Sequence, residues 1–180
     1  GLQMAQCFAD AYKEHNWQAV FASPMRRTRA TVEPLCKALN VSPEIRDGLC
    51  EIKYGEWEGK TLEFVKSTYS EDYLKWLAEP AWNAPTAGET AVQIAGRAMP
   101  VIFEIQNRFS SGNVLVVSHK ATIRIILCSL LGIELGRYRD RIDAPAGSIS
   151  KVRFDIHGPL LELLGDRSYM NKDLRSRTGT

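Results

Sequence analysis

The chain has 180 residues, 44% of them apolar and 24% charged, which is the composition of an ordinary soluble domain with one core. Its net charge of +2, without a basic run longer than the pair Arg26-Arg27, argues against nucleic acid and membrane surfaces as partners. No apolar stretch approaches the length of about 18 residues that a membrane span needs, and the chain opens with no basic-then-apolar leader, so we expect neither a span nor a secretory signal.

The four cysteines show no C-x-x-C spacing and lie mostly among apolar residues, at Cys7, Cys36, Cys50 and Cys128. This pattern predicts reduced thiols in a cytoplasmic protein rather than disulfides or a metal site.

The first part of the chain predicts a helix, a strand and a second helix. Residues 2–15 have an apolar face at helical spacing, and residues 17–22 form a short apolar run typical of a strand. Ser23-Pro24 are expected to cap and begin the next helix, which carries Arg26 and Arg27 in its first turn. Cations are unfavourable at a helix start unless an anion is supplied, so this corner suits a bound phosphate; an exposed basic face is the alternative.

Residues 49–60 predict a loop of defined shape, because two glycines bracket an aromatic residue among carboxylates. Glu51 lies between Cys50 and Ile52 and is the carboxyl with the best chance of partial burial. Burial raises the proton affinity of a carboxyl, so Glu51 is a candidate general acid; a purely structural glutamate is the alternative.

The middle of the chain predicts helices. One begins after Thr61, another includes Tyr73, and a longer one runs from a capping box at Thr90 and Gln93 through residue 108. Glu89 precedes this cap and either satisfies the helix end or faces the pocket. In the loop at 76–88, Trp82 and Pro85 are candidates for substrate specificity; aromatic side chains that pack on the sheet are the alternative.

The most informative segment is residues 113–131, in which an apolar run meets a helical pattern at His119. Four consecutive apolar residues predict a parallel strand buried on both faces. Ligands of open α/β sheets bind at the carboxyl edge of such strands, and free N–H groups at a helix start favour anions. His119 is therefore a candidate phosphate ligand, with a structural histidine as the alternative.

After that helix, Gly132 is a natural stop and residues 137–143 form a charged connector. Residues 148–154 and 160–164 predict two strands joined by a turn at His157. We expect one domain over residues 1–166, followed by a polar, poorly ordered tail over 167–180.

The chain resembles the histidine phosphatase (phosphoglycerate mutase-like) superfamily, and within it the small phosphatase branch. Four signatures occur in order: SPMRRT at residues 23–28, E51 with YGEWEG at 54–59, GET at 88–90 and VVSH at 116–119. The short separation of Glu51 from His119 favours hydrolysis over the isomerisation that a mutase performs.

The resemblance implies a three-layer α/β/α sandwich with a mostly parallel sheet, a phosphohistidine mechanism and no metal or other cofactor. On the matching positions, Arg27 would bind phosphate, Glu51 would be the general acid and His119, as a cation, would stabilise the transferred group. Lys120, where many members have glycine, either adds a cation beside the phosphate or points to solvent. We count Lys120 and Glu89 as candidate substrate ligands.

One signature is missing, because no Arg-His-Gly occurs in the sequence and His15 lies in the first predicted helix. We therefore expect the chain to be a fragment of a phosphomonoester hydrolase of small phosphorylated metabolites, inactive without an upstream strand whose loss leaves two unpaired strand edges. The alternatives are an inactive phospholigand-binding or regulatory relative, a mutase-type phosphotransferase and an unrelated α/β domain. The oligomeric state stays open.

Overall fold

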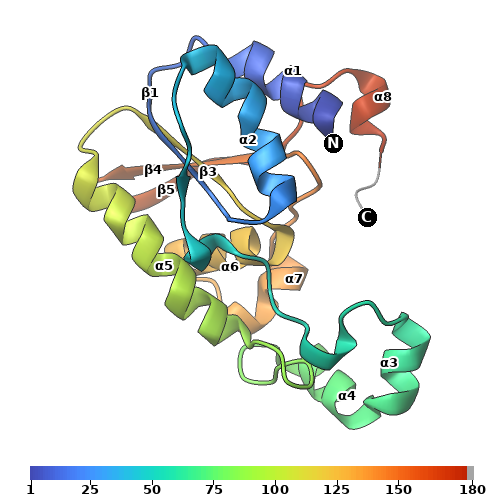
Figure 1. Ribbon diagram of the computed structural model, residues 1–180. Helices are drawn as coiled ribbons and strands as arrows, with labels where there is room; N and C mark the ends of the chain where they lie inside the picture. Colours follow the sequence, from blue (N-terminus) through green and yellow to red (C-terminus); the bar gives the residue numbers. More distant parts are fainter. Residues whose placement is uncertain (178–180) are drawn as a thin grey trace.

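The computed structural model describes residues 1–177, and its centre is a short parallel sheet (Figure 1). Its strands lie in the order β2-β1-β3, with β1 (Trp17–Ala22) in the middle, β2 (Glu44–Ile45) on one side and β3 (Asn113–Val117) on the other. β4 (Ile149–Asp155) and β5 (Gly158–Asp166) pair as an antiparallel hairpin that forms a separate sheet.

Helices cover both faces of the parallel sheet. α1 (Leu2–Tyr12) and α2 (Arg26–Leu39) pack on one face, where Val20 and Ala22 of β1 point. α5 (Ala91–Arg108) and α6 (Lys120–Leu131) pack on the other, around Phe21. Because alternate side chains of a strand point to opposite faces, β1 supplies both cores at once. The structure confirms the predicted three-layer α/β fold with a parallel sheet.

The remaining helices are short and lie away from the sheet. They are α3 (Leu62–Thr68), α4 (Ser70–Ala78), α7 (Tyr138–Arg141) and α8 (Lys172–Arg175). Figure 1 shows α3 and α4 as a protrusion at one corner of the molecule. Three 3-10 turns, at Asp47–Leu49, Gly55–Trp57 and Leu135–Arg137, shape the connections.

The β3 strand is less buried than its sequence predicted. Val116 and Val117 are only partly buried, whereas Phe21 and Ala22 of neighbouring β1 are fully buried. Within residues 1–177, β3 pairs with β1 alone, and no ladder joins it to the β4–β5 hairpin. The expected parallel strand with both faces covered is confirmed, since Leu115 and Val117 pack against one core and Val114 and Val116 against the other. The burial is only partial, because one edge of β3 has no neighbouring strand within residues 1–177.

Several local sequence signals predicted the helix caps and ends correctly. Thr61 caps α3 through a bond from the Phe64 N–H, and Thr90 and Gln93 form the predicted capping box of α5. Gly132 ends α6 in the left-handed region at φ 67°. Gly55 is also required, because a side chain there would meet the Thr86 carbonyl and its φ is 58°.

Two predicted boundaries were wrong at the start of the chain. The first helix ends at Tyr12, and α2 begins at Arg26 with Met25, not Ser23, as its N-cap. Ser23 instead extends the sheet, since its N–H donates to the Val117 carbonyl and its side chain is fully buried. A long-range strand contact thus outweighed a local capping preference.

The predicted poorly ordered tail was also wrong over the residues that are described. α8 is capped by the Asn171 side chain, which accepts from the Leu174 N–H, and Met170 and Leu174 are buried. Residues 178–180 of the predicted tail lie outside the described residues. Similarly, the charged connector at 137–143 contains α7.

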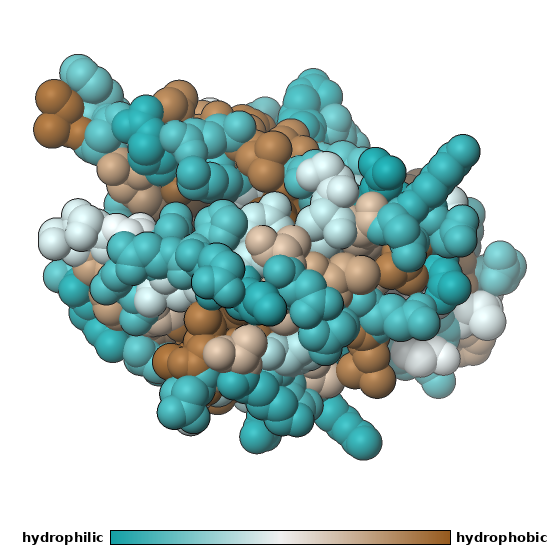
Figure 2. Space-filling model, turned by 90° about the horizontal axis from the view of Figure 1, so that it is seen from above, coloured by the Kyte–Doolittle hydropathy of each residue, from teal (hydrophilic) through white to brown (hydrophobic). Residues whose placement is uncertain are grey.

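All four cysteines are free, and Cys36 and Cys128 are buried. Figure 2 shows a face on which hydrophilic residues predominate and hydrophobic ones form small separate patches. Among residues 1–177, none of the helices has both the length and the apolar character that a bilayer crossing requires.

Candidate active site

Two strand-to-helix corners lie side by side at the carboxyl edge of the sheet. His119 is the N-cap residue of α6, just after β3, and Arg27 lies in the first turn of α2, which follows β1. The Arg27 Nε donates to His119 Nδ1 at 3.0 Å, and His119 Nε2 lies 2.9 Å from Ser23 Oγ. Because a guanidinium only donates, Nδ1 must accept and the ring proton sits on Nε2, facing the serine hydroxyl.

His119 is a neutral base in this arrangement. Its side chain is buried, and burial, followed by the positive charges of Arg27 and Arg97, lowers its pKa to about 4. The expectation of a cationic His119 concerns the phosphate-bound site and stays a prediction. An anion bound beside Arg27 would offset these charges and favour the protonated ring.

Arg27 has the exposure that an anion ligand needs. Its terminal nitrogens have no partner among residues 1–177, and its side chain lines a hollow at the start of α2 together with Met25, Arg26 and Ala30. The first turn of α2 contains no acidic residue to balance this charge. The helix dipole and the guanidinium therefore both favour an anion at this position.

Glu51 is held against the first turn of α6. One of its carboxylate oxygens accepts from its neighbour Ile52 N–H at 3.0 Å and from Thr122 N–H at 3.4 Å. The Thr122 hydroxyl in turn donates to the Cys50 carbonyl at 2.6 Å. The loop that carries Glu51 is thereby fastened to the helix that begins at His119, so the three predicted catalytic residues come from segments that meet.

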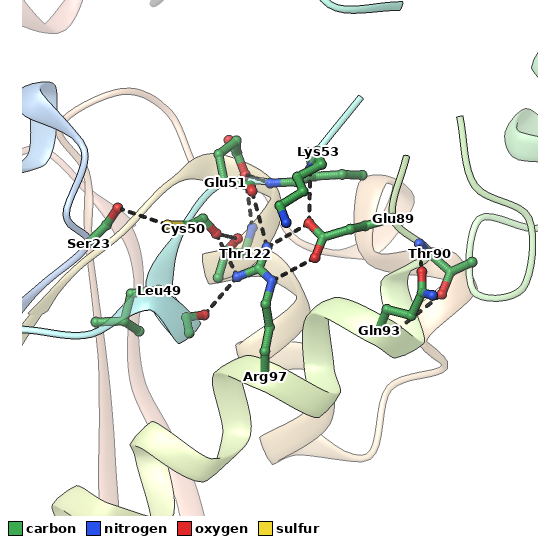
Figure 3. A network of polar contacts seen from close by, with 12 residues as sticks. Ser23, Leu49, Cys50, Glu51, Lys53, Glu89, Thr90, Gln93, Arg97 and Thr122 are labelled. Carbon is green, nitrogen blue, oxygen red and sulfur yellow. Dashed lines mark hydrogen bonds and ion pairs between the residues drawn. The ribbon is translucent and has the colours of Figure 1, made fainter. Parts of the chain in front are cut away.

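Arg97 of α5 organises this loop and was missed in the sequence. Figure 3 shows its guanidinium at the centre of a polar network, and it donates to the carbonyls of Gly48 and Cys50 at 2.8 Å each and of Glu51 at 3.1 Å. One signal was available: position 97 falls on the apolar face of α5 near buried Ile94 and Val101. A cation on such a face implies buried acceptors opposite it.

Glu89 is the acidic partner of Arg97. It receives bonds from Arg97 at 2.9 and 3.0 Å and from the Lys53 N–H at 2.9 Å. Burial alone would raise the pKa of Glu89, but these bonds outweigh it and lower the pKa below its ordinary value. Both oxygens therefore contact protein groups, while Lys120 is exposed at the start of α6. Their roles as substrate ligands stay predictions.

Within residues 1–177, no group of three or more histidine, cysteine, aspartate or glutamate side chains is placed to hold a metal ion. His15 stacks on Tyr12 with ring centroids 4.9 Å apart, and His157 lies in the turn between β4 and β5. His15 precedes the amino end of β1, and His157 belongs to the hairpin, so of the three histidines only His119 follows the carboxyl end of a strand of the parallel sheet.

The family model of the histidine phosphatase superfamily (branch 1) matches residues 1–167. The chain belongs to this superfamily. Among curated proteins, it is 29% identical over 138 residues to phosphoserine phosphatase 1 of Hydrogenobacter thermophilus, covering 77% of this chain and 65% of that protein. It is 25% identical over 145 residues to glucosyl-3-phosphoglycerate phosphatase of Mycolicibacterium vanbaalenii, covering 77% and 64%.

Among solved structures, the Bacillus stearothermophilus protein YhfR superposes with a TM-score of 0.85 at 22% identity, over 94% of this chain and 84% of that one. This likeness shows the fold. The match with phosphoserine phosphatase 1 spans only 65% of that relative's length, so this chain corresponds to less than two thirds of it.

Proposed function

We propose that the chain is the larger part of a phosphomonoester hydrolase that acts on a small phosphorylated metabolite through a phosphohistidine. The observation that supports this most is the Arg27–His119 contact at the carboxyl edge of a parallel sheet, with the terminal guanidinium nitrogens free to bind an anion. The curated relatives named above are phosphatases of phosphoserine and of glucosyl-3-phosphoglycerate, which are both phosphate monoesters.

The chemistry assigned to each residue follows from charge. Phosphoryl transfer needs positive charge around the equatorial oxygens, and Arg27 supplies it. As phosphate binds, its negative charge raises the pKa of His119, and the protonated ring then donates from Nδ1 to a phosphoryl oxygen in place of accepting from Arg27. Glu51 gives a proton to the leaving oxygen and later takes one from the attacking water.

The nucleophile is proposed to come from outside these 180 residues, because they contain no Arg-His-Gly. The open edge of β3 supports this proposal. Within residues 1–177, β3 leads to His119 and pairs with β1 alone, and the β4–β5 hairpin forms a separate sheet. A further strand pairing with β3 would end at the same carboxyl edge as Arg27 and His119. The chain by itself is accordingly proposed to bind phosphate without turnover.

The test compares variants of the protein expressed together with its upstream coding sequence, with p-nitrophenyl phosphate as substrate. Arg27→Ala and His119→Ala should each lower kcat by at least about a hundredfold, the usual scale for one charge-stabilising group. Arg29→Ala is the matched control, because Arg29 is an exposed arginine of the same helix turn. Near-normal rates in either test variant would remove that residue from the site.

The 180-residue chain alone provides the second measurement. Vanadate or phosphate should raise its Tm, and Arg27→Ala but not Arg29→Ala should abolish the effect. Protection without hydrolysis, even with the upstream segment restored, would instead identify an inactive phospholigand-binding relative. The absence of any protection would contradict a phosphate site at Arg27.

A further inference from the structure

A second pair of arginines lies beyond Glu51, outside the residues assigned to the phosphate. Arg124 is on the second turn of α6, and Arg139 is on α7, which packs against α6 (Figure 1). Tyr54 connects them to Glu51: burial raises the pKa of Tyr54, the charge of Glu51 adds to this, and the charges of Arg139 and Arg124 oppose it. All three charged groups therefore lie within electrostatic range of one phenol.

Arg124 is a largely buried cation with too few acceptors. Its side chain is 14% exposed, and its Nε is buried without a hydrogen-bond partner. Its contact with Asp143 is long, at 3.5 Å, and the Asp143 side chain is 81% exposed. A buried guanidinium costs free energy unless acceptors surround it, and an exposed carboxylate at this distance offsets little of that cost. Arg124 is thus left with donor capacity directed at no protein group.

Arg139 is held rigidly nearby. Its guanidinium lies 3.9 Å from the centroid of the Trp76 ring, and one nitrogen donates to the carbonyls of Trp76 at 2.9 Å and Leu77 at 3.2 Å. The Trp76 ring packs edge-on against Tyr54, with centroids 6.4 Å apart. The other two guanidinium nitrogens of Arg139 have no partner in the described part of the chain. Stacking on Trp76 holds the Arg139 guanidinium in one orientation, so little conformational entropy is lost when an anion binds to it.

The position of this pair follows from the direction of the reaction. If Glu51 protonates the leaving oxygen, the organic part of the substrate extends past Glu51, away from Arg27. Tyr54 follows Glu51 by three residues, the charges of both arginines act on its hydroxyl, and its ring packs against the Trp76 ring that stacks on Arg139. An organic part that extends past Glu51 on this side therefore comes within range of both arginines. Two cations there select for negative charge on the substrate, and the planar forks of arginine match a carboxylate.

We propose that Arg124 and Arg139 form a second anion subsite that binds a carboxylate of the substrate, so that the preferred substrates are phosphate esters of small hydroxy acids. This inference rests on the proposed function, which places phosphate at Arg27 and the leaving group at Glu51. It adds a substrate class and names two specificity residues, Arg124 and Arg139, that contact neither the phosphate nor the reacting oxygen.

The test measures binding of two esters that differ only in the group concerned, by calorimetry on the 180-residue chain. 3-Phosphoglycerate has a carboxylate where glycerol 3-phosphate has a hydroxymethyl group. We expect 3-phosphoglycerate to bind at least about tenfold more tightly, as one or two charge-assisted hydrogen bonds provide. Arg124→Gln should remove this preference and leave the Kd for glycerol 3-phosphate unchanged. Arg139→Lys, which keeps the charge without the stack, should reduce the preference for 3-phosphoglycerate.

Arg141→Gln is the matched control, since Arg141 is an exposed arginine of α7. If Arg124→Gln weakens both esters equally, or weakens neither, the second subsite is wrong while phosphate binding at Arg27 stands. If the unaltered chain binds glycerol 3-phosphate and 3-phosphoglycerate equally, the subsite is likewise wrong. If it binds neither ester nor inorganic phosphate, the proposed function and the subsite both fail.

Discussion

The protonation state of His119 is set by its two hydrogen-bond partners. Arg27 requires an acceptor at Nδ1 and Ser23 offers an oxygen to Nε2, so the neutral ring satisfies both contacts and a protonated ring would lose the one with Arg27. Of these two side chains, Arg27 therefore carries the positive charge while the His119 ring is neutral. A substrate anion is needed before the imidazole can act as a second cation.

This state predicts a pH titration that NMR can follow on the His119 ring. The pKa of about 4 in the free chain should rise on addition of vanadate, because a nearby anion favours the protonated form. Arg27→Gln should also raise the pKa, since it removes a neighbouring positive charge. A pKa near the ordinary value of 6.5 in the free chain would contradict the arrangement.

The same shift contributes to stability in a defined pH window. The pKa of His119 is 6.5 when unperturbed and about 4 in the folded chain, so between these values the unfolded state binds more protons. The contribution of the buried, neutral His119 to the free energy of unfolding is therefore complete above about pH 6.5 and declines as the pH falls toward 4. Urea melts of His119→Gln should show a flatter dependence over this range.

Residues with a role at a strand end could be predicted from the sequence, and residues with a role through distant partners could not. Arg27 and His119 stand out because a change from strand to helix periodicity marks each position. Ser23 was interpreted as a cap because its sequence neighbours suit one, while its partner His119 is 96 positions away. Arg97 carries no local sign of the loop it contacts beyond its place on an apolar helix face.

At the scale of elements, α5 positions the Glu51 loop through one buried ion pair. The Arg97 and Glu89 side chains are 22% and 14% exposed, and Arg97 also donates to three loop carbonyls. Removing the arginine leaves a largely buried carboxylate with no neutralising cation and takes one hydrogen-bond donor from each of those carbonyls. The ion pair therefore ties the fold of the loop to the integrity of α5.

Arg97→Met should lower the free energy of unfolding by about 3 kcal/mol, which is the scale for breaking a buried pair. Chemical denaturation measures this, and Glu33→Gln is the control because its pair with Lys37 on α2 is exposed and screened by solvent, so its loss should change the free energy of unfolding far less. The double variant Arg97→Met with Glu89→Leu should recover part of the loss, since no unpaired charge remains. Equal losses in the single and double variants would indicate that the carbonyl contacts dominate.

Element types were predictable because they depend on local periodicity and capping, as at Thr61, Thr90 and Gly132. The residues at which elements begin and end were less predictable. α2 begins later than expected because Ser23 joins the sheet, and the segment after residue 166 is folded because Met170 and Leu174 find buried positions. Both depend on contacts that a sequence pattern does not contain.

At the scale of the whole molecule, the parallel sheet of residues 1–177 stops at β3, although helices cover both of its faces. Both faces of β3 pack against cores as its apolar run predicted, but the open edge leaves its side chains only partly buried. An unpaired apolar strand edge beside the site is a place where another strand can add. The exposure of β3 and the missing nucleophile motif are thus explained by the same proposed strand.

This geometry predicts the hydrogen exchange of individual amides. Successive N–H groups of a strand point to opposite sides, so with β1 as its only partner, alternate amides of β3 lack an acceptor within residues 1–177. We expect these amides to exchange at least about a hundredfold faster than those of Val20 to Ala22 in β1, which lie in the middle of the sheet.

Expression together with the upstream segment should slow the exchange of these fast β3 amides selectively and leave β1 unchanged. Dilution must not alter the pattern, because strand pairing between two copies would also protect the edge. Uniformly slow exchange along β3 in the dilute 180-residue chain would show that its edge is already covered, and the proposed strand would then have no place to pair.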